Sequence, residues 1–116
     1  MYKRILVAND GSPGAERALL AALALTRQSG AALHMISIEE LPRFPASIDE
    51  VVEEKDAANH RFSDVIKRAQ YLGKEVKIAF HVKVGHAVPT IAEFAKAQGI
   101  DLLVLGFMGH SAITTG

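Results

Sequence analysis

The sequence predicts an α/β fold: a doubly wound, open parallel sheet with helices on both faces. Two short apolar runs, residues 5–8 and 102–105, are typical of strands buried on both sides, and each ends in polar or glycine residues. Between them strand and helix patterns alternate, which right-handed crossovers build into such a sheet. Because ligands of these sheets collect at the carboxyl ends of neighbouring strands, we expect Asp10 and the bend at 106–109 to face one crevice.

The composition limits the classes of function. A chain of 116 residues has room for one core, and we expect residues 1–116 to form a single domain. Thirteen Lys and Arg balance thirteen Asp and Glu without a basic block, which argues against a nucleic-acid partner. The absence of cysteine excludes disulfides and thiolate metal sites. No apolar run has signal-peptide or membrane length, so we expect a cytoplasmic protein without a membrane partner.

The first strand should be followed by a helix and a second strand. Ser12 is a good helix N-cap and a proline follows it, so we interpret Ser12 as a cap and not as a nucleophile. Gly30 suits a left-handed helix end. Residues 31–38 predict the second strand, which ends at Glu39 and Glu40, two side chains that we expect to be solvated. The helix should bury residues at three and four residue spacing: Ala15, Ala18, Leu19, Ala22 and Leu23.

The middle of the chain predicts a loop and a second helix. Two prolines at 41–47 prevent regular pairing. A capping box follows, so the helix should begin at Ile48 or Asp49 and end at Gly73. Its sustained apolar stripe comes late: Ala58, Phe62, Val65, Ile66, Ala69 and Leu72.

Residues 76–84 alternate apolar and polar side chains, which predicts an edge strand buried on one face. Residues 85–89 should turn the chain into a third helix that ends at Gly99. We interpret His34 and His81, which lie inside strands, as packing or surface residues, because the histidines show no metal-ligand spacing. The apolar stripe of the third helix is Val88, Ile91, Ala92 and Ala95.

Three segments together resemble the universal stress protein family. They are Lys-Arg-Ile-Leu-Val-Ala-Asn-Asp-Gly-Ser at 3–12, Gly-X-X-X-Pro at 85–89, and Asp-Leu-Leu-Val-Leu-Gly-X-X-Gly-His-Ser at 101–111. The likeness covers essentially the whole chain. It implies a Rossmann-like sheet of strand order 3-2-1-4-5, a stress-response role, and ATP, with or without Mg²⁺, as the ligand.

The resemblance also implies a set of binding residues. Asp10 matches an aspartate near the ribose, although it could equally cap the turn into the first helix. Gly106 and Gly109 match a phosphate loop, where glycine lets backbone amides approach an anion, but they could also be plain turn glycines. The remaining matches line the adenine, at Ala8, Asn9 and Ile38, or flank the loop glycines, at Leu105 and His110.

The sequence departs from the family pattern near its end. Phe107 and Met108 stand where relatives carry a small hydroxyl and a basic or imidazole residue, and the second half of the phosphate loop would fall beyond Gly116. The family's last helix and fifth strand are also missing. We therefore expect a C-terminally incomplete domain of strand order 3-2-1-4, with residues 102–105 as an exposed apolar edge.

Three functions remain open. The first is an ATP-binding regulatory module that forms a homodimer. The second is a dimerisation or partner-interaction module of the same family that binds no nucleotide, which Phe107 and Met108 favour. The third is a slow Mg²⁺-dependent ATP hydrolase. We assign no catalytic residue and no metal ligand, because no base and nucleophile lie together in the sequence.

Overall fold

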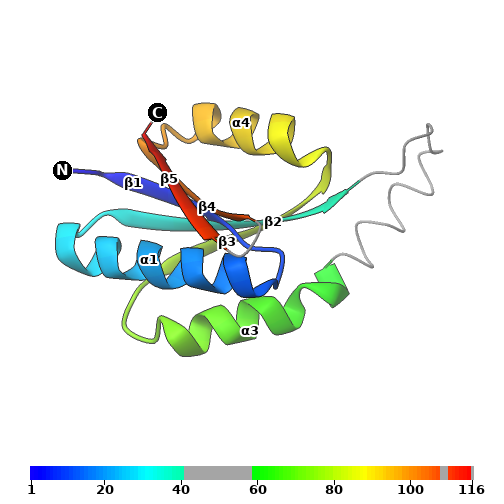
Figure 1. The fold of residues 1–116 in the computed structure, drawn as a ribbon, viewed down its shortest axis with the longest axis horizontal. Helices are drawn as coiled ribbons and strands as arrows, with labels where there is room; N and C mark the ends of the chain where they lie inside the picture. The colour runs from blue at the N-terminus through cyan, green and yellow to red at the C-terminus, as the bar shows by residue number, and fades with distance from the viewer. Residues whose placement is uncertain (41–58, 108–109, 116) are drawn as a thin grey trace.

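Five strands form one sheet in the order β3-β2-β1-β4-β5 (Figure 1). The computed structural model describes residues 1–40, 59–107 and 110–115, with the backbone alone for 107 and 110–115. Strands β1 to β4 are parallel, which confirms the predicted order 3-2-1-4 and the edge position of β3. The elements are β1 Arg4–Ala8, α1 Pro13–Ser29, β2 Ala32–Glu40, α3 Ser63–Leu72, β3 Ile78–Gly85, α4 Ala87–Ala97, β4 Leu102–Phe107 and β5 His110–Thr115.

Helices α1 and α3 cover one face of the sheet and α4 covers the other (Figure 1). The Ser12 hydroxyl accepts a hydrogen bond from the Ala15 N–H at 3.2 Å, and Gly30 ends α1 with φ 73°, so both predicted caps are confirmed. Gly73 ends α3 as predicted. The predicted apolar stripe of α1 is buried throughout, and all of it except Ala15 joins the strands in one core that includes Ile5, Val7, Leu33, Met35, Leu102 and Val104.

The starts of β1 and β4 are joined by the side chain of Asp101. Its carboxylate accepts hydrogen bonds from the backbone N–H groups of Lys3, at 2.8 Å, and Arg4, at 3.0 Å. These two bonds hold the pKa of Asp101 below its ordinary value. The aspartate that opens the apolar run at 102–105 therefore fixes the register of the two central strands.

A fifth strand does form, so the expectation that this chain lacks one was wrong. Strand β5 pairs antiparallel with β4 from Leu102↔Thr115 to Phe107↔His110, and two residues separate the strands. The predicted exposed edge at 102–105 is therefore covered. The segment 110–115 contains β-branched residues and follows β4 after a connection of two residues, a length common in hairpins.

Helix α4 begins earlier, and faces the sheet differently, than the sequence predicted. Pro89 lies inside its first turn and not in the preceding turn; this is tolerated because the first N–H groups of a helix have no intrahelical acceptor. Val88, 78% exposed, and Ala92 point to solvent. The half-buried positions are Ala87, Thr90, Ile91, Phe94 and Ala95.

His34 on β2 and His81 on β3 form an imidazole pair beneath α4. The His34 Nδ1 and His81 Nε2 atoms lie 3.0 Å apart, and the Phe94 ring packs on both imidazoles with centroid distances of 5.8 and 4.5 Å. The prediction that these histidines serve packing is confirmed. Among the described residues, no three His, Cys, Asp or Glu side chains are grouped closely enough to hold a metal ion.

Two further expectations concern the middle of the chain and its membrane character. The predicted loop at 41–47, the helix start at Ile48 or Asp49 and the stripe residue Ala58 lie outside the described residues. The later stripe does pack: Phe62 and Ala69 are buried, and Val65, Ile66 and Leu72 flank the core. Within the described part of the chain, no helix combines the length and hydropathy needed to cross a membrane.

Candidate ligand crevice

A crevice of about 310 Å³ lies where β1, β2 and β4 end, beside the first turns of α4. Asp10 and Gly106 both line it, as expected from the sequence. Gly109 lies outside the described residues, and His110 begins β5, where the side chain is not described. The crevice therefore brings together six of the eight residues implied by the resemblance: Ala8, Asn9, Asp10, Ile38, Leu105 and Gly106.

Asp10 stands at the rim of the crevice as a turn-capping carboxylate. It accepts a hydrogen bond from the backbone N–H of Ser12 at 2.9 Å, which is the capping role left open above. Partial burial raises the pKa of Asp10, but hydrogen bonds from the hydroxyl and the N–H of Ser12 outweigh it, so the net pKa lies below the ordinary value. The side chain is thus ionised at neutral pH and remains at the crevice wall.

Asn9 fixes the loop between β1 and α1. It is 6% exposed, and its Oδ1 accepts from the Gly11 N–H at 2.9 Å. Its own N–H donates to the Ile36 carbonyl at 2.9 Å, and its carbonyl accepts from the Ser37 hydroxyl at 2.7 Å. Its side-chain amide reaches the Met35 sulfur at 3.4 Å. Because the side-chain and backbone polar groups of Asn9 are all hydrogen-bonded within the protein, we interpret Asn9 as a residue that holds the crevice wall in position.

Glu40 joins the end of β2 to the start of α4, which corrects the expectation that the acidic pair is merely solvated. Its Oε1 accepts from the first helical N–H, that of Ala87, at 2.9 Å, and its Oε2 lies 3.6 Å from Nδ1 of His86. A carboxylate at a helix N-terminus satisfies a free donor and opposes the positive end of the helix dipole. Glu39 forms an ion pair with Arg61.

Gly106 lies inside β4 and not in an open loop, which corrects the predicted bend at this position. An added Cβ would lie 2.1 Å from the carbonyl oxygen of Gly14 and 2.8 Å from the N–H nitrogen of Ala15. The absence of a side chain therefore lets β4 touch the first turn of α1. Packing supplies a sufficient reason for glycine here.

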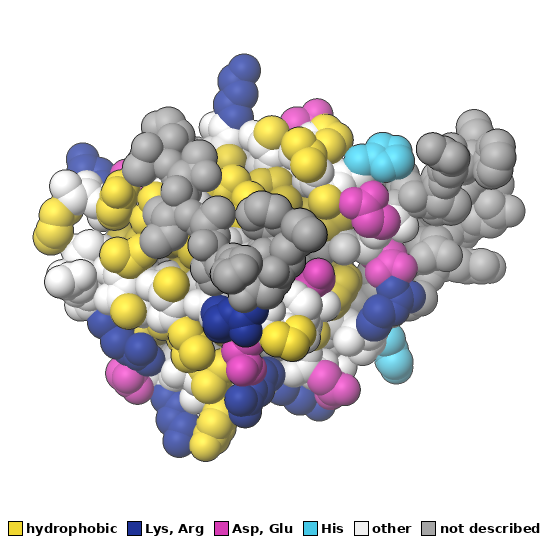
Figure 2. All heavy atoms as spheres, viewed as in Figure 1, with side chains coloured by type: hydrophobic (Ala, Val, Ile, Leu, Met, Phe, Trp, Pro, Cys, Tyr) yellow, Lys and Arg dark blue, Asp and Glu magenta, His cyan; other side chains and the backbone are white. Residues whose placement is uncertain are grey.

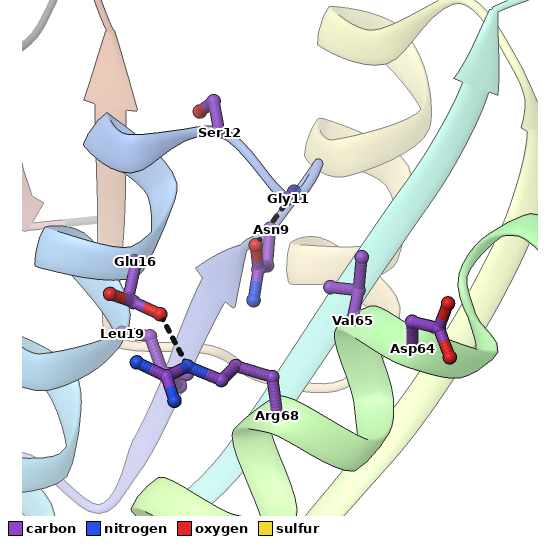
Figure 3. Close-up of a pocket in the computed structure, with 8 residues that line it drawn as sticks. All are labelled: Asn9, Gly11, Ser12, Glu16, Leu19, Asp64, Val65 and Arg68. Atoms are coloured by element: carbon purple, nitrogen blue, oxygen red, sulfur yellow. Dashed lines mark hydrogen bonds and ion pairs between the residues drawn. The ribbon is translucent and has the colours of Figure 1, made fainter.

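A second, smaller hollow of about 180 Å³ lies between α1 and α3, behind the same loop (Figure 3). Arg68 reaches across from α3, and its Nε donates to Oε1 of Glu16 on α1 at 2.8 Å. Gly11, at φ 87°, packs against Val65, where a Cβ would meet the methyl group at 3.1 Å. Because the Arg68–Glu16 ion pair spans this hollow, the hollow is a weaker candidate for a ligand site than the crevice.

Sequence reasoning missed five residues that line the crevice. Glu40 ends the second strand, so its position at the same sheet edge as Asp10 was available from the strand pattern. Ala87 and Ile91 are four residues apart at the start of α4, which begins at that edge. Ala15 and Ile36 carry no separate signal, because their apolar pattern only indicates core.

Charges of both signs are mixed on the face of the molecule that Figure 2 shows. Figure 2 shows Lys and Arg side chains alternating with Asp and Glu over α1 and α3, without a continuous field of one sign on this face. The ion pairs Arg68–Glu16 and Arg27–Glu75 belong to this pattern. Pairs this exposed contribute little to stability.

The four parallel strands, the helices on both faces and the crevice at the strand ends define a doubly wound α/β protein with a crevice at its topological switch point. The model of the universal stress protein family matches residues 1–115, and the chain therefore belongs to that family. The chain is 32% identical over 117 residues to universal stress protein A homolog 2 of Coxiella burnetii, covering 97% of this chain and 80% of the relative.

Solved structures agree with this fold. Universal stress protein UspA from Lactobacillus plantarum is similar with a TM-score of 0.78 and 25% identity, over 90% of this chain and 76% of that one. A universal stress protein in complex with cAMP is similar with a TM-score of 0.68 and 23% identity, over 88% of this chain and 74% of that one. The second likeness concerns the fold alone.

Proposed function

We propose that this protein is a regulatory module that binds an adenine nucleotide or nucleoside in the crevice at the carboxyl ends of β1, β2 and β4. The observation that carries the proposal is that the Asp10 carboxylate lines a mainly apolar crevice at the switch point of the sheet. Ligand sites are commonly apolar hollows with a few placed polar groups. The cAMP complex of a relative with the same fold adds support.

The walls of the crevice suit a purine and a ribose. Ala8 and Ile38 supply apolar surface from β1 and β2, and Ala87 and Ile91 supply it from α4. The Asp10 carboxylate can accept hydrogen bonds from ribose hydroxyls, and these bonds are strong because the acceptor is ionised. The volume lies at the small end of the range of roughly 300–1,000 Å³ for ligand pockets, which fits a nucleoside better than a longer molecule.

Filling the crevice should weaken ligand binding. Ala87 is the first residue of α4 and lines the hollow, so Ala87→Phe should place a ring where the base would lie. We expect adenosine and AMP to bind the wild type in isothermal titration, and at least about tenfold weaker binding to this variant, the loss of roughly 1.4 kcal/mol or more.

Ala92→Phe is the matched control, because Ala92 lies on the exposed side of the same helix. This variant should bind like the wild type. Equal affinity of the wild type and Ala87→Phe would remove the crevice from the proposal, and no heat with any adenine compound would overturn the proposed function.

We also propose that the protein self-associates, the role shared with the alternative hypothesis of a partner-interaction module. The supporting observation is that β5 forms one edge of the sheet, with no described strand beyond it. Unpaired N–H and carbonyl groups on a strand edge favour pairing with a second chain. Sedimentation equilibrium should give twice the chain mass at micromolar concentration; a mass of one chain throughout would contradict this.

A further inference from the structure

Among the described residues that line the crevice, every charged side chain is acidic. Eleven described residues line it; two of them, Asp10 and Glu40, are acidic, and none is Lys, Arg or His. Glu40 is the last residue of β2, and Asp10 follows the end of β1 by two residues; the two strands are adjacent. His86 lies 3.6 Å from Glu40, at the start of α4, but is not part of the lining. The described walls therefore present negative charge to any ligand.

The described backbone at Gly106 is held in a strand and forms no open loop that could cradle a phosphate chain. Strand pairing continues through Gly106↔Ser111 to Phe107↔His110, so this stretch is held as a strand. On its other side, Gly106 touches the first turn of α1, where an added Cβ would lie 2.1 Å from the Gly14 oxygen. A phosphate seated at the start of a helix needs space in front of the free N–H groups. Here β4 lies directly against the backbone of Gly14 and Ala15, and the Ala15 N–H already donates to the Ser12 hydroxyl.

We propose that the crevice recognises the uncharged purine nucleoside, with base and ribose as the whole recognised unit, and discriminates against phosphates attached to it. This inference rests on the proposed function and names the chemical class of ligand for the same site. The apolar walls receive the base, Asp10 receives the ribose hydroxyls, and Glu40 repels an anionic 5′ substituent near the end of β2.

Coulomb repulsion sets the expected order of ligands. Every added phosphate brings further negative charge toward Asp10 and Glu40, and the repulsion is screened by salt. Mg²⁺ neutralises part of the ATP charge. The order of affinity should therefore be adenosine, then AMP, then ATP, with Mg·ATP between AMP and free ATP.

The test is isothermal titration of the wild-type protein with adenosine, AMP, ATP and Mg·ATP at about 50 and 500 mM salt, where the Debye length falls from roughly 14 to 4 Å. We expect ATP to bind at least about tenfold more weakly than adenosine at low salt, and the gap to narrow at high salt. ATP binding as tightly as adenosine, or more tightly, would overturn the inference and leave the proposed function standing. If no adenine compound binds, the proposed function itself fails.

Glu40→Gln removes the negative charge of residue 40 and keeps the size and shape of its side chain. The amide oxygen can still accept from the Ala87 N–H, so the α4 start keeps its hydrogen bond. The ratio of adenosine to AMP affinity should fall by about threefold, because one repelling charge is gone. Glu75→Gln is the matched control: it removes the same charge from an exposed ion pair with Arg27, away from the crevice, and should leave the ratio unchanged. An unchanged ratio in Glu40→Gln would overturn the role given to Glu40.

Discussion

Gly106→Ala should destabilise the protein by about 3 kcal/mol, at the upper end of the range for overpacked cores. The new methyl group would overlap the backbone of Gly14 and Ala15, at 2.1 and 2.8 Å. Backbone atoms of a helix cannot turn aside as a flexible side chain can, so β4 and α1 would have to separate. Urea unfolding of wild type and variant, compared at equal m-values, measures the difference.

Gly30→Ala provides the comparison for this prediction. Gly30 has φ 73° and nothing within 4 Å of an added Cβ, so its cost is conformational alone, roughly 1 kcal/mol. A loss below about 1 kcal/mol in Gly106→Ala would show that β4 can move away from α1. In that case a phosphate could also be admitted there, and the preference for a nucleoside would lose one of its two supports.

The folded protein should lose stability as the pH falls below about 6.5, the ordinary imidazole pKa. Burial lowers the pKa of His34, with a smaller effect of Arg4, and burial followed by the charges of His34 and Lys83 lowers the pKa of His81. The unfolded chain therefore takes up protons first, and each proton adds a slope of about 1.4 kcal/mol per pH unit. The loss begins near the unfolded pKa and levels off below the folded values.

The geometry of the pair gives the same direction. A hydrogen bond between His34 Nδ1 and His81 Nε2 needs one nitrogen without a proton, and two imidazolium rings at 3.0 Å have no acceptor between them. The two rings should titrate as one coupled pair. Because Phe94 packs on both rings, protonation should loosen α4, whose first turn lines the crevice.

Thermal unfolding between pH 5 and 8 checks this prediction. A double variant, His34→Gln with His81→Gln, cannot titrate in this range and should give a flatter profile than the wild type. His60→Gln removes an exposed histidine and should leave the wild-type profile in place. Parallel profiles for the wild type and the double variant would contradict the assignment to this pair.

The motif positions predicted both that Asp10 and Gly106 share a crevice and that the glycine serves a phosphate; the structure supports only the first of these predictions. Asp10 and Gly106 do line one hollow, as the motif positions predicted. However, Gly106 is required by the packing of β4 on α1, and Asp10 caps a turn through Ser12. Neither residue therefore needs a phosphate to account for it, whereas the apolar walls and the carboxylates still define a site for a small polar molecule with an apolar ring.

The sequence by itself determined the order of β1 to β4 and of the helices between them, the caps of α1 and the edge position of β3. These features depend on side-chain periodicity and on residues adjacent in the chain, such as Ser12 before its helix and Gly30 after it. The motif positions also located the sheet edge that carries the crevice. Local signals of this kind act within a few residues of the chain, so the features they specify can be predicted from the sequence alone.

Only the tertiary structure decided which distant groups meet. Glu40 and the Ala87 N–H are 47 residues apart, as are His34 and His81, and no local pattern specifies either pair. The pairing of β5 with β4 and the contact of Gly106 with Gly14 likewise depend on how the sheet closes against α1. The sign of the charge in the crevice follows from these long-range contacts, because the strand ends that carry Asp10 and Glu40 become neighbours only when the sheet forms.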